Sequence, residues 1–312
     1  MSPSIRSFGY WLEQLLAEST GKEGRGLIPV NGEFLGAPEV YGDDRVFIHM
    51  ALSGDNNVAD EQKLKVLEEA GHPIVRIKIE NKIALGGEYY RWEIAAAIAG
   101  VVIGINPFNQ PNVEESKKNT SDLLEGWSKN GDFKIPAPLL KIENISVYVG
   151  KRTEQLAKGH YESEGNLINS FTSLARPNDY IALLPYFLMT DPRTKILQAW
   201  RQWMRDTFKN ATTLLNGPRY LHSTGQLHKG GPDTGLYIIL IGEEEKDLAI
   251  PGENFGFATL HEAQALGDFH SLDDKGRRVI RIQLGKDIDA GLNALYQSVG
   301  EAQKHLIHEE VF

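Results

Sequence analysis

LEEAGHPIVRIKI, residues 67–79, has the pattern of a helix end, a glycine turn and a buried strand, and it aligns without a gap on LDDKGRRVIRIQL, residues 272–284. The offset between the two segments is 205 residues. Two shorter matches lie at nearly the same offset: Ser19-Thr20-Gly21 on Ser223-Thr224-Gly225, and Ile83 and Gly86 on Ile288 and Gly291. Matches at nearly one offset predict two related units, and chance similarity between two α/β units is the alternative.

Strand-like and helix-like runs alternate along the whole chain. Short apolar runs rich in β-branched residues predict buried strands at residues 45–52, 73–79, 180–187, 235–242 and 278–284. Helical apolar spacing predicts helices at residues 59–71, 88–100 and 191–209. This order predicts an α/β fold in which each unit is a mainly parallel sheet flanked by helices. We expect the strand-like runs of the two matching segments, and the strands before them, to be inner strands.

The boundary between the units is predicted in SKNGDFKIPAPLL, residues 128–140, which is polar and punctuated by Gly and Pro. Unit one is then residues 1–127 and unit two, an accessory unit, residues 128–312. A strand and an amphipathic helix precede Ser-Thr-Gly in unit two, whereas unit one has only 18 residues there and no strand. We therefore expect that the first unit lacks its first strand and that the chain is a C-terminal piece of a longer protein.

Composition excludes several classes of function. The net charge is −9 and no basic stripe offsets it, which argues against nucleic acid as the main partner. The chain has no cysteine, so it has no disulfide, thiolate metal site or cysteine nucleophile. The N-terminus has no signal-peptide core, and the longest apolar run, residues 94–105, is too short to span a bilayer. These features predict a soluble cytoplasmic protein without a membrane partner.

Glu18 is the first candidate for chemistry. Apolar residues at positions 8, 11, 12, 15 and 16 predict a helix on which Gln14 and Glu18 project from one face. The loop that follows contains Ser19, Thr20 and three glycines, whose hydroxyl and backbone groups are suited to an oxyanion. A carboxylate beside such a loop is suited to act as a general base when partial burial raises its pKa. The alternative is a solvated glutamate at a helix end.

GINPFNQPNVEESKKNT, residues 104–120, is the second candidate segment. It follows a long apolar helix and carries amides, among them Gln110, and a lysine, Lys117. These side chains are suited to hydroxyl and oxyanion contacts. Taken alone, the segment also fits a helix-turn-helix with a solvated lysine.

Together the two segments resemble the C-terminal half of the phosphoglucose isomerase family. The resemblance implies two sugar-isomerase-type (SIS-like) units, Glu18 as the catalytic glutamate, Gln14 and Gln110 as substrate contacts, and Lys117 as the active-site lysine. Ser19, Thr20, Ser223 and Thr224 would then contact the substrate. The variants AESTGKEGRG and YLHSTGQLHKGGP look like the isomerase part of bifunctional transaldolase/phosphoglucose isomerase proteins.

The chain departs from the family in three places. Thr20 replaces the usual Asn, and Pro111-Asn112 replaces Trp-Gly or Pro-Gly. The run that holds the family's ring-opening histidine is not recognisable. His49 falls near the position of the ring-opening histidine, but it lies in a predicted strand, where the alternative is a packed core residue. His228 is the second candidate for this role, and His222 is the third. The family's Ser/Thr-rich phosphate loop is also not found in this sequence. By the resemblance, that loop belongs to a separate N-terminal isomerase subdomain. The sequence does not decide whether a transaldolase domain is fused to the chain or whether the protein is a homo-oligomer.

The resemblance implies interconversion of glucose 6-phosphate and fructose 6-phosphate by proton transfer through a cis-enediol, without a metal or redox cofactor. This chain would supply part of the active site. The alternative is a non-catalytic sugar-phosphate-binding or assembly module, which suits unit two because it has His222 instead of a glutamate before Ser223.

Overall fold

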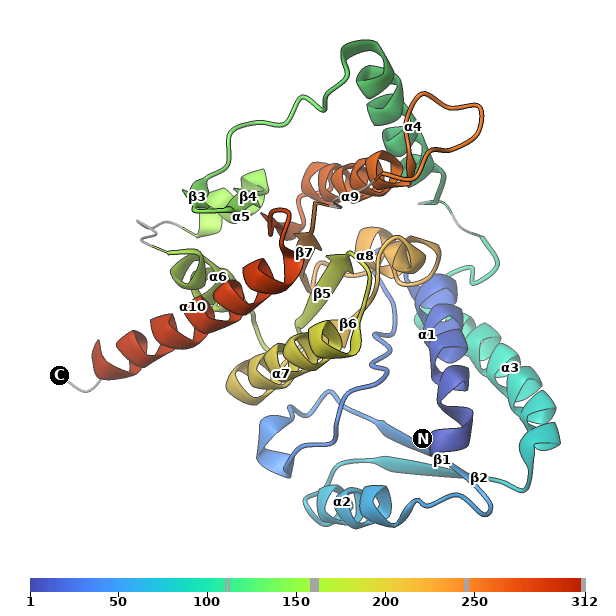
Figure 1. The fold of residues 1–312 in the computed structure, drawn as a ribbon. Helices are drawn as coiled ribbons and strands as arrows, with labels where there is room; N and C mark the ends of the chain where they lie inside the picture. The colour runs from blue at the N-terminus through green and yellow to red at the C-terminus, as the bar shows by residue number, and fades with distance from the viewer. Residues whose placement is uncertain (110, 112, 158–162, 244–246, 310–312) are drawn as a thin grey trace.

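The computed structural model of the chain describes residues 1–109, 111, 113–157, 163–243 and 247–309 (Figure 1). Its α-helices are α1 (Arg6–Thr20), α2 (Val58–Glu69), α3 (Leu85–Ile103), α4 (Val113–Asn130), α5 (Lys151–Leu156), α6 (Glu164–Thr172), α7 (Asp191–Phe208), α8 (Gly225–Gly230), α9 (Phe257–Asp274) and α10 (Ile288–Glu309). Its strands are β1 (Phe47–Leu52), β2 (Ile74–Ile79), β3 (Leu140–Ile142), β4 (Ile145–Val149), β5 (Tyr180–Tyr186), β6 (Ala211–Leu214), β7 (Gly235–Ile241) and β8 (Arg278–Gln283). Short 3₁₀ helices are η1 (Pro3–Ile5), η2 (Pro38–Val40), η3 (Lys82–Ala84) and η4 (Arg219–His222).

The smaller sheet consists of β1 and β2, which pair in parallel with Phe47 opposite Ile74. Alternate side chains of β1 face opposite sides, as the strand period requires. Met50 and Leu52 pack with residues of α1 and α3, whereas Phe47 packs with residues of α2. The parallel pairing predicted from the sequence is confirmed, but both strands are edges of this two-stranded sheet, so the expectation that they are inner strands is wrong.

The larger sheet has six strands in the order β3-β4-β8-β7-β5-β6. Its four strands from β8 to β6 are parallel, and β3 and β4 add an antiparallel edge. One core cluster places α6, α7 and α10 on one face, and a second places α9 on the other. The predicted α/β fold with mainly parallel sheets is therefore confirmed, and β7 and β8 are inner strands as expected.

The order β1-α2-β2-α3 of the smaller sheet corresponds to β7-α9-β8-α10 of the larger one. Both pairs of strands are parallel neighbours, which agrees with the sequence repeat. The Ser-Thr-Gly match does not extend to the backbone. Thr20 is the last residue of α1, whereas Thr224 is the N-cap of α8. The same three residues therefore end a helix in one unit and begin one in the other.

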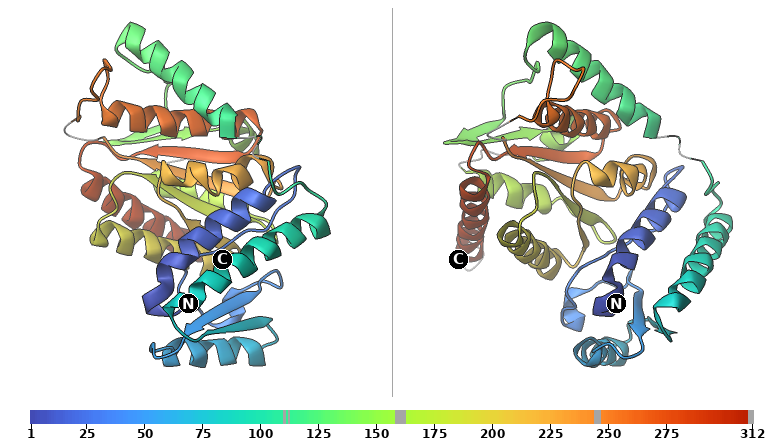
Figure 2. Two further views of the ribbon diagram at one scale, coloured as in Figure 1. Left: turned by 90° about the vertical axis from the view of Figure 1, so that its right-hand side faces the viewer. Right: turned by 45° about the vertical axis from the view of Figure 1, so that its right-hand side comes forward.

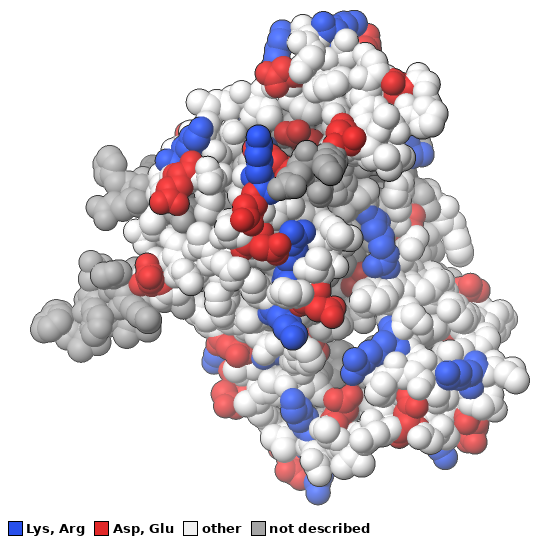
Figure 3. All heavy atoms as spheres, in the orientation of Figure 1, with Lys and Arg blue, Asp and Glu red and all other residues white. Residues whose placement is uncertain are grey.

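Helix α4 spans the predicted boundary between the units. It continues to Asn130, beyond residue 127, and packs alongside α9, where Leu123 and Trp127 of α4 contact a cluster that contains Leu266 (Figures 1 and 2). The two-unit division itself stays a prediction. Among the residues that the structure describes, no helix combines the length and the apolar character needed to cross a membrane. Lys and Arg side chains are interspersed with Asp and Glu on the face shown in Figure 3.

The two Ser-Thr-Gly segments meet in space. Gln226 Nε2 of α8 donates to the carbonyl of Gly21 at 2.9 Å. The amide of Gly24 donates to the carbonyl of Gly230 at 2.9 Å. Gly21 lies so close to the backbone of Leu227 that a Cβ atom at Gly21 would overlap it. The loop after α1 is therefore packed against α8.

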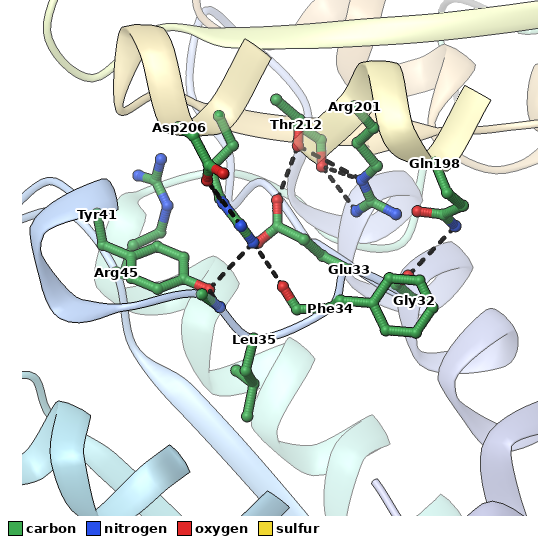
Figure 4. Close-up of polar contacts among 12 residues, drawn as sticks. Gly32, Glu33, Phe34, Leu35, Tyr41, Arg45, Gln198, Arg201, Asp206 and Thr212 are labelled. Atoms are coloured by element: carbon green, nitrogen blue, oxygen red, sulfur yellow. Dashed lines mark hydrogen bonds and ion pairs between the residues drawn. The ribbon is translucent and has the colours of Figure 1, made fainter. Parts of the chain in front are cut away.

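A second set of contacts joins the chain between α1 and β1 to α7 and β6 (Figure 4). Arg201 Nη1 donates to the carbonyl of Asn31 at 3.0 Å, and the Thr212 hydroxyl donates to Glu33 Oε1 at 2.7 Å. Arg205 Nη1 lies 3.7 Å from Glu33 Oε2. Arg201 and Arg205 are 1% and 3% exposed, so these bonds are shielded from water and hold the smaller sheet in place relative to the larger one.

We predict that Gly21→Ala destabilises the protein by about 1–3 kcal/mol, because the new methyl group must displace the Leu227 backbone. Urea unfolding of the two proteins measures the difference. Gly86→Ala is the matched control, since a Cβ there meets nothing within 4 Å. Equal stability of the Gly21→Ala and Gly86→Ala proteins would show that the loop is not packed on α8.

Candidate active site

The end of α1 presents two of the predicted residues together. Gln14 Nε2 donates to Glu18 Oε2 at 3.3 Å, as their spacing of four residues allows. Thr20 closes the helix, because its hydroxyl donates to the carbonyl of Leu16 at 2.6 Å and accepts from the amide of Leu27 at 3.0 Å. Gln14 and Glu18 therefore lie on one face of α1, and the Thr20 hydroxyl forms hydrogen bonds with the backbone at the end of the helix.

The end of α3 turns the chain back toward α1. Gly104 has φ +73°, the left-handed conformation that glycine adopts most readily. The amide of Ile105 then donates to the carbonyl of Gly100 at 2.9 Å, and that of Gly104 donates to Val101 at 3.3 Å, which is a Schellman motif. Pro107 packs so closely on Gly100 that a Cβ atom there would lie 2.8 Å from Pro107 Cγ. This turn places the segment after α3 over the end of α1.

Two cations of the loop after α1 bind the carbonyl groups at this turn. Lys22 Nζ donates to the carbonyl of Asn106 at 3.1 Å, and Arg25 Nη1 donates to that of Ile103. The last carbonyls of a helix lack partners within it and carry partial negative charge, so cations are favourable there. Lys22 and Arg25 therefore join the two segments that the sequence singled out.

A hollow of about 290 Å³ lies between these segments. Its lining residues come from the second half of α1 and from the turn after α3: Trp11, Gln14, Leu15, Glu18, Ser19, Pro107 and Phe108. Glu18 is half-buried in it. The hollow thus combines a carboxylate, an amide and a hydroxyl with apolar walls, which is a suitable setting for a base that acts on a carbon acid.

Lys22 is a residue that the sequence analysis missed. Its side chain is 1% exposed, and burial lowers its pKa from the ordinary value, while the nearby carboxylates of Glu18 and Glu23 act in the opposite direction. Its charge therefore lies within electrostatic range of Glu18. In the sequence, the only indication of a role for Lys22 was its position directly after Ser-Thr-Gly. Its contact with Asn106, 84 residues away, identifies it as a residue of the site.

The loop from Ser19 to Gly26 uses its polar groups internally. The amide of Lys22 donates to the carbonyls of Thr20 and Arg25, and the amides of Gly21, Gly24 and Arg25 also donate to protein carbonyls. Backbone amides at these four positions are not open to an anion. The predicted contact of this loop with an oxyanion therefore depends on the side chain of Ser19, which lines the hollow.

The predicted residues of the second unit lie in its interior. Ser223 and Thr224 are 5% and 1% exposed, and Ser223 Oγ donates to the carbonyl of Tyr220 at 3.2 Å. His228 is 1% exposed and lies among Tyr180, Tyr220 and Tyr237. Burial, followed by the charges of Lys229 and Arg277, holds the pKa of His228 well below its usual value. None of these residues lines the hollow beside Glu18.

The remaining predicted residues lie apart from the hollow or outside the described residues. Gln110 is outside the described residues. Lys117 is exposed on α4 and is not among the residues that line the hollow. His49 is 2% exposed, and its Nδ1 lies 2.7 Å from Glu61 Oε1 of α2. His49 follows the same alternation as Phe47, so it lies on the sheet face opposite α1.

Curated glucose-6-phosphate isomerases match part of the chain. The enzyme of Lactobacillus gasseri is 34% identical over 158 residues, which cover 39% of this chain and 35% of that protein. That of Lactobacillus johnsonii is 32% identical over 158 residues with the same coverage, and that of Leptospira biflexa is 30% identical over 164 residues, 39% of this chain and 36% of that protein. The chain thus spans about a third of the length of these relatives.

These matches confirm the resemblance for part of the chain, which is similar to a part of these glucose-6-phosphate isomerases. No protein-family profile matches the chain. A solved structure of a hypothetical protein from Thermus thermophilus aligns with 97% of this chain and with 81% of the residues of that protein. The sequence identity is 14% and the TM-score is 0.33, which is too low to indicate a shared fold.

Glu13 of α1 provides a test of the packing behind the hollow. Burial raises its pKa to about 7, against the opposing charges of Arg219 and Arg201. The unfolded chain releases this proton near pH 4.5 and the folded chain near pH 7, so stability falls as the pH rises through this window and stays lower above it. We predict that Glu13→Gln stabilises the protein by about 2–3 kcal/mol at pH 8 and much less at pH 4.

Urea unfolding at both pH values measures the effect, with the exposed Glu69→Gln as the control. A gain for Glu13→Gln that is the same at pH 4 and pH 8 would contradict a buried, proton-binding Glu13.

Proposed function

We propose that this chain supplies part of the active site of a glucose-6-phosphate isomerase, with Glu18 as the general base. The observation that carries the proposal is the hollow in which Glu18 and Gln14 of α1 meet Pro107 and Phe108 of the turn after α3. The two segments that resemble the isomerase family, far apart in the sequence, form its opposite walls. The named function of the relatives, which match over 39% of the chain, supports the same assignment.

The proposed reaction moves one carbon-bound proton. After the sugar ring has opened, the Glu18 carboxylate takes the proton from C2 and returns it to C1. A proton also passes from the oxygen on C2 to the oxygen on C1, so the aldose becomes a ketose through a cis-enediol without net gain or loss. One carboxylate is sufficient because both carbons are reached from one side. Gln14, which already donates to Glu18, orients that carboxylate.

The developing enediolate requires a cation, because its negative charge must be stabilised for the weakly acidic C–H bond to break. We propose Lys117, on the basis of the motif, as the cation that contacts the substrate. Lys22 acts as a positioning residue, since its bond to the Asn106 carbonyl joins the two walls of the hollow. The Glu18 carboxylate in turn favours the charged form of the buried Lys22 side chain.

We further propose that a partner subdomain completes the site. α3 exposes a row of apolar side chains, and the segment after it adds one more: Tyr90, Ile94, Ile98, Val101, Val102 and Phe108. The two-stranded sheet of β1 and β2 leaves both edges unpaired within the described residues. A large apolar patch and open strand edges are features that a neighbouring domain covers. The matched relatives are about three times as long as the matched region, and the predicted N-terminal isomerase subdomain is the occupant we propose.

That subdomain would bind the phosphate group, because four amides of the loop after α1 already donate to protein carbonyls. The histidine that opens the ring, a homo-oligomeric state, a fused transaldolase domain, SIS-type units and a cytoplasmic location stay predictions. A non-catalytic sugar-phosphate-binding or assembly module is the alternative function.

We predict that Glu18→Gln lowers isomerase turnover by roughly 10²–10⁴-fold, the usual contribution of a general base, while the affinity for a sugar phosphate changes little. The assay uses the longest natural polypeptide that contains this chain, because remote binding of the phosphate helps to drive the reaction. Glu69→Gln is the matched control, since Glu69 is exposed at the end of α2.

Near-normal turnover in the Glu18→Gln protein would contradict Glu18 as the base. Sugar-phosphate binding without turnover in the unsubstituted protein would instead favour the binding module.

A further inference from the structure

Arg281 is a buried cation that has no carboxylate at hydrogen-bond distance within the described part of the chain. It is 2% exposed in β8, and its Nε and Nη1 atoms have no hydrogen-bond partner among the described residues. Arg278 in the same strand is equally buried, but its Nη1 lies 2.7 Å from Asp179 Oδ2. A buried charge normally has a partner of opposite sign. Of these two arginines, only Arg278 has a carboxylate at hydrogen-bond distance among the residues that the structure describes.

The surroundings of Arg281 orient its guanidinium group. Its Cζ lies 3.7 Å from the centroid of the Tyr148 ring and 5.8 Å from that of the Phe269 ring. Stacking on an aromatic face leaves the N–H groups in the plane of the guanidinium to bind an acceptor. Burial lowers the pKa of Arg281, and Tyr148 and Glu262 only partly oppose this effect. An anion in the same plane would restore the lost stabilisation of the charge.

Arg281 lines a cavity of about 800 Å³ that shares no lining residue with the hollow beside Glu18. Its walls come from α4, α9, β4 and the segment between α4 and β3, and much of the wall is apolar, for example Leu123, Ile135, Leu139 and Leu266. A cavity of this size and character, with a few polar groups at one place, is typical of a small-molecule site.

The charges around the cavity limit the charge of its ligand. Asp122 and Glu154 also line it, as do Asp273 and Asp274, which pair with Lys151. These carboxylates repel a dianion more strongly than a monoanion. The fork of an arginine matches the two oxygens of a carboxylate. We infer that this cavity binds a small organic acid, whose carboxylate pairs with Arg281 and whose apolar body lies against the walls from α4 and α9.

Binding of octanoate to the whole chain, followed by calorimetry, tests the inference. We expect saturable binding, and we expect Arg281→Met to weaken it roughly 10–100-fold, the effect of losing a charged hydrogen bond. Ala137→Trp is a second variant, because Ala137 is exposed and lines the cavity, so a large side chain there fills space without altering β8. It should also weaken binding, with unchanged thermal stability. Leu248→Trp, an exposed position outside the lining, is the control and should bind octanoate normally.

Octyl phosphate and inorganic phosphate are the comparison probes. Octanoate binding that exceeds both supports the inference. Tighter binding of octyl phosphate, or equal binding of inorganic phosphate, overturns the assignment to a carboxylate. Absence of octanoate binding at millimolar concentration, or binding that neither Arg281→Met nor Ala137→Trp changes, overturns the site itself.

Discussion

The carbonyl groups at the end of α3 and in the turn after it require hydrogen-bond donors, and the loop that follows α1 provides two of them. Lys22 binds the carbonyl of Asn106 and Arg25 that of Ile103, so residues 84 and 78 positions apart in the chain are held together. The contact satisfies the helix end and brings positive charge to its negative pole. Because Glu18 lies directly before this loop and Pro107 directly after Asn106, the same contact fixes both walls of the hollow.

Helices α7 and α8 support this arrangement. Gly21 packs on Leu227 of α8, and Gln226 binds the carbonyl of Gly21, so the loop is held on the side away from α3 as well. Arg201 and Arg205 of α7 hold the chain between α1 and β1. We therefore expect α7 and α8 to act as a rigid base for the active-site loop, whereas the cavity beside Arg281, between α4 and α9, offers a separate binding function.

Local pattern was sufficient to predict the longer strands and part of the helices. β-Branched runs located the five longest strands, and apolar spacing located α2, α3 and α7, because burial of one face imposes those periods on the sequence. β3, β4 and β6 were missed because strands of three to five residues leave little period to detect. The Ser-Thr-Gly repeat was found from the sequence. That the first copy ends α1 and the second begins α8 depends on which carbonyls lie nearby in the folded chain.

The site was predictable only in part, for the same reason. Gln14 and Glu18 share a face because of helical spacing, which the sequence shows directly. The burial of Lys22 and Arg281 and the internal use of the Thr20 hydroxyl all depend on contacts between segments that are distant in the sequence. No local pattern encodes such contacts. The pairing of His49 with Glu61 likewise became visible only when α2 was placed over β1.

Exchange of hydrogen between fructose 6-phosphate and D₂O tests the role of Glu18 most directly, because it reports removal of the carbon-bound proton itself. The measurement is deuterium incorporation at C1, followed by NMR, in the longest natural polypeptide that contains this chain and in its Glu18→Gln and Glu69→Gln variants. The proposed mechanism predicts exchange in the unsubstituted and Glu69→Gln proteins, and a loss of roughly 10²-fold or more in Glu18→Gln while sugar-phosphate binding persists. Exchange at the normal rate in Glu18→Gln would contradict it.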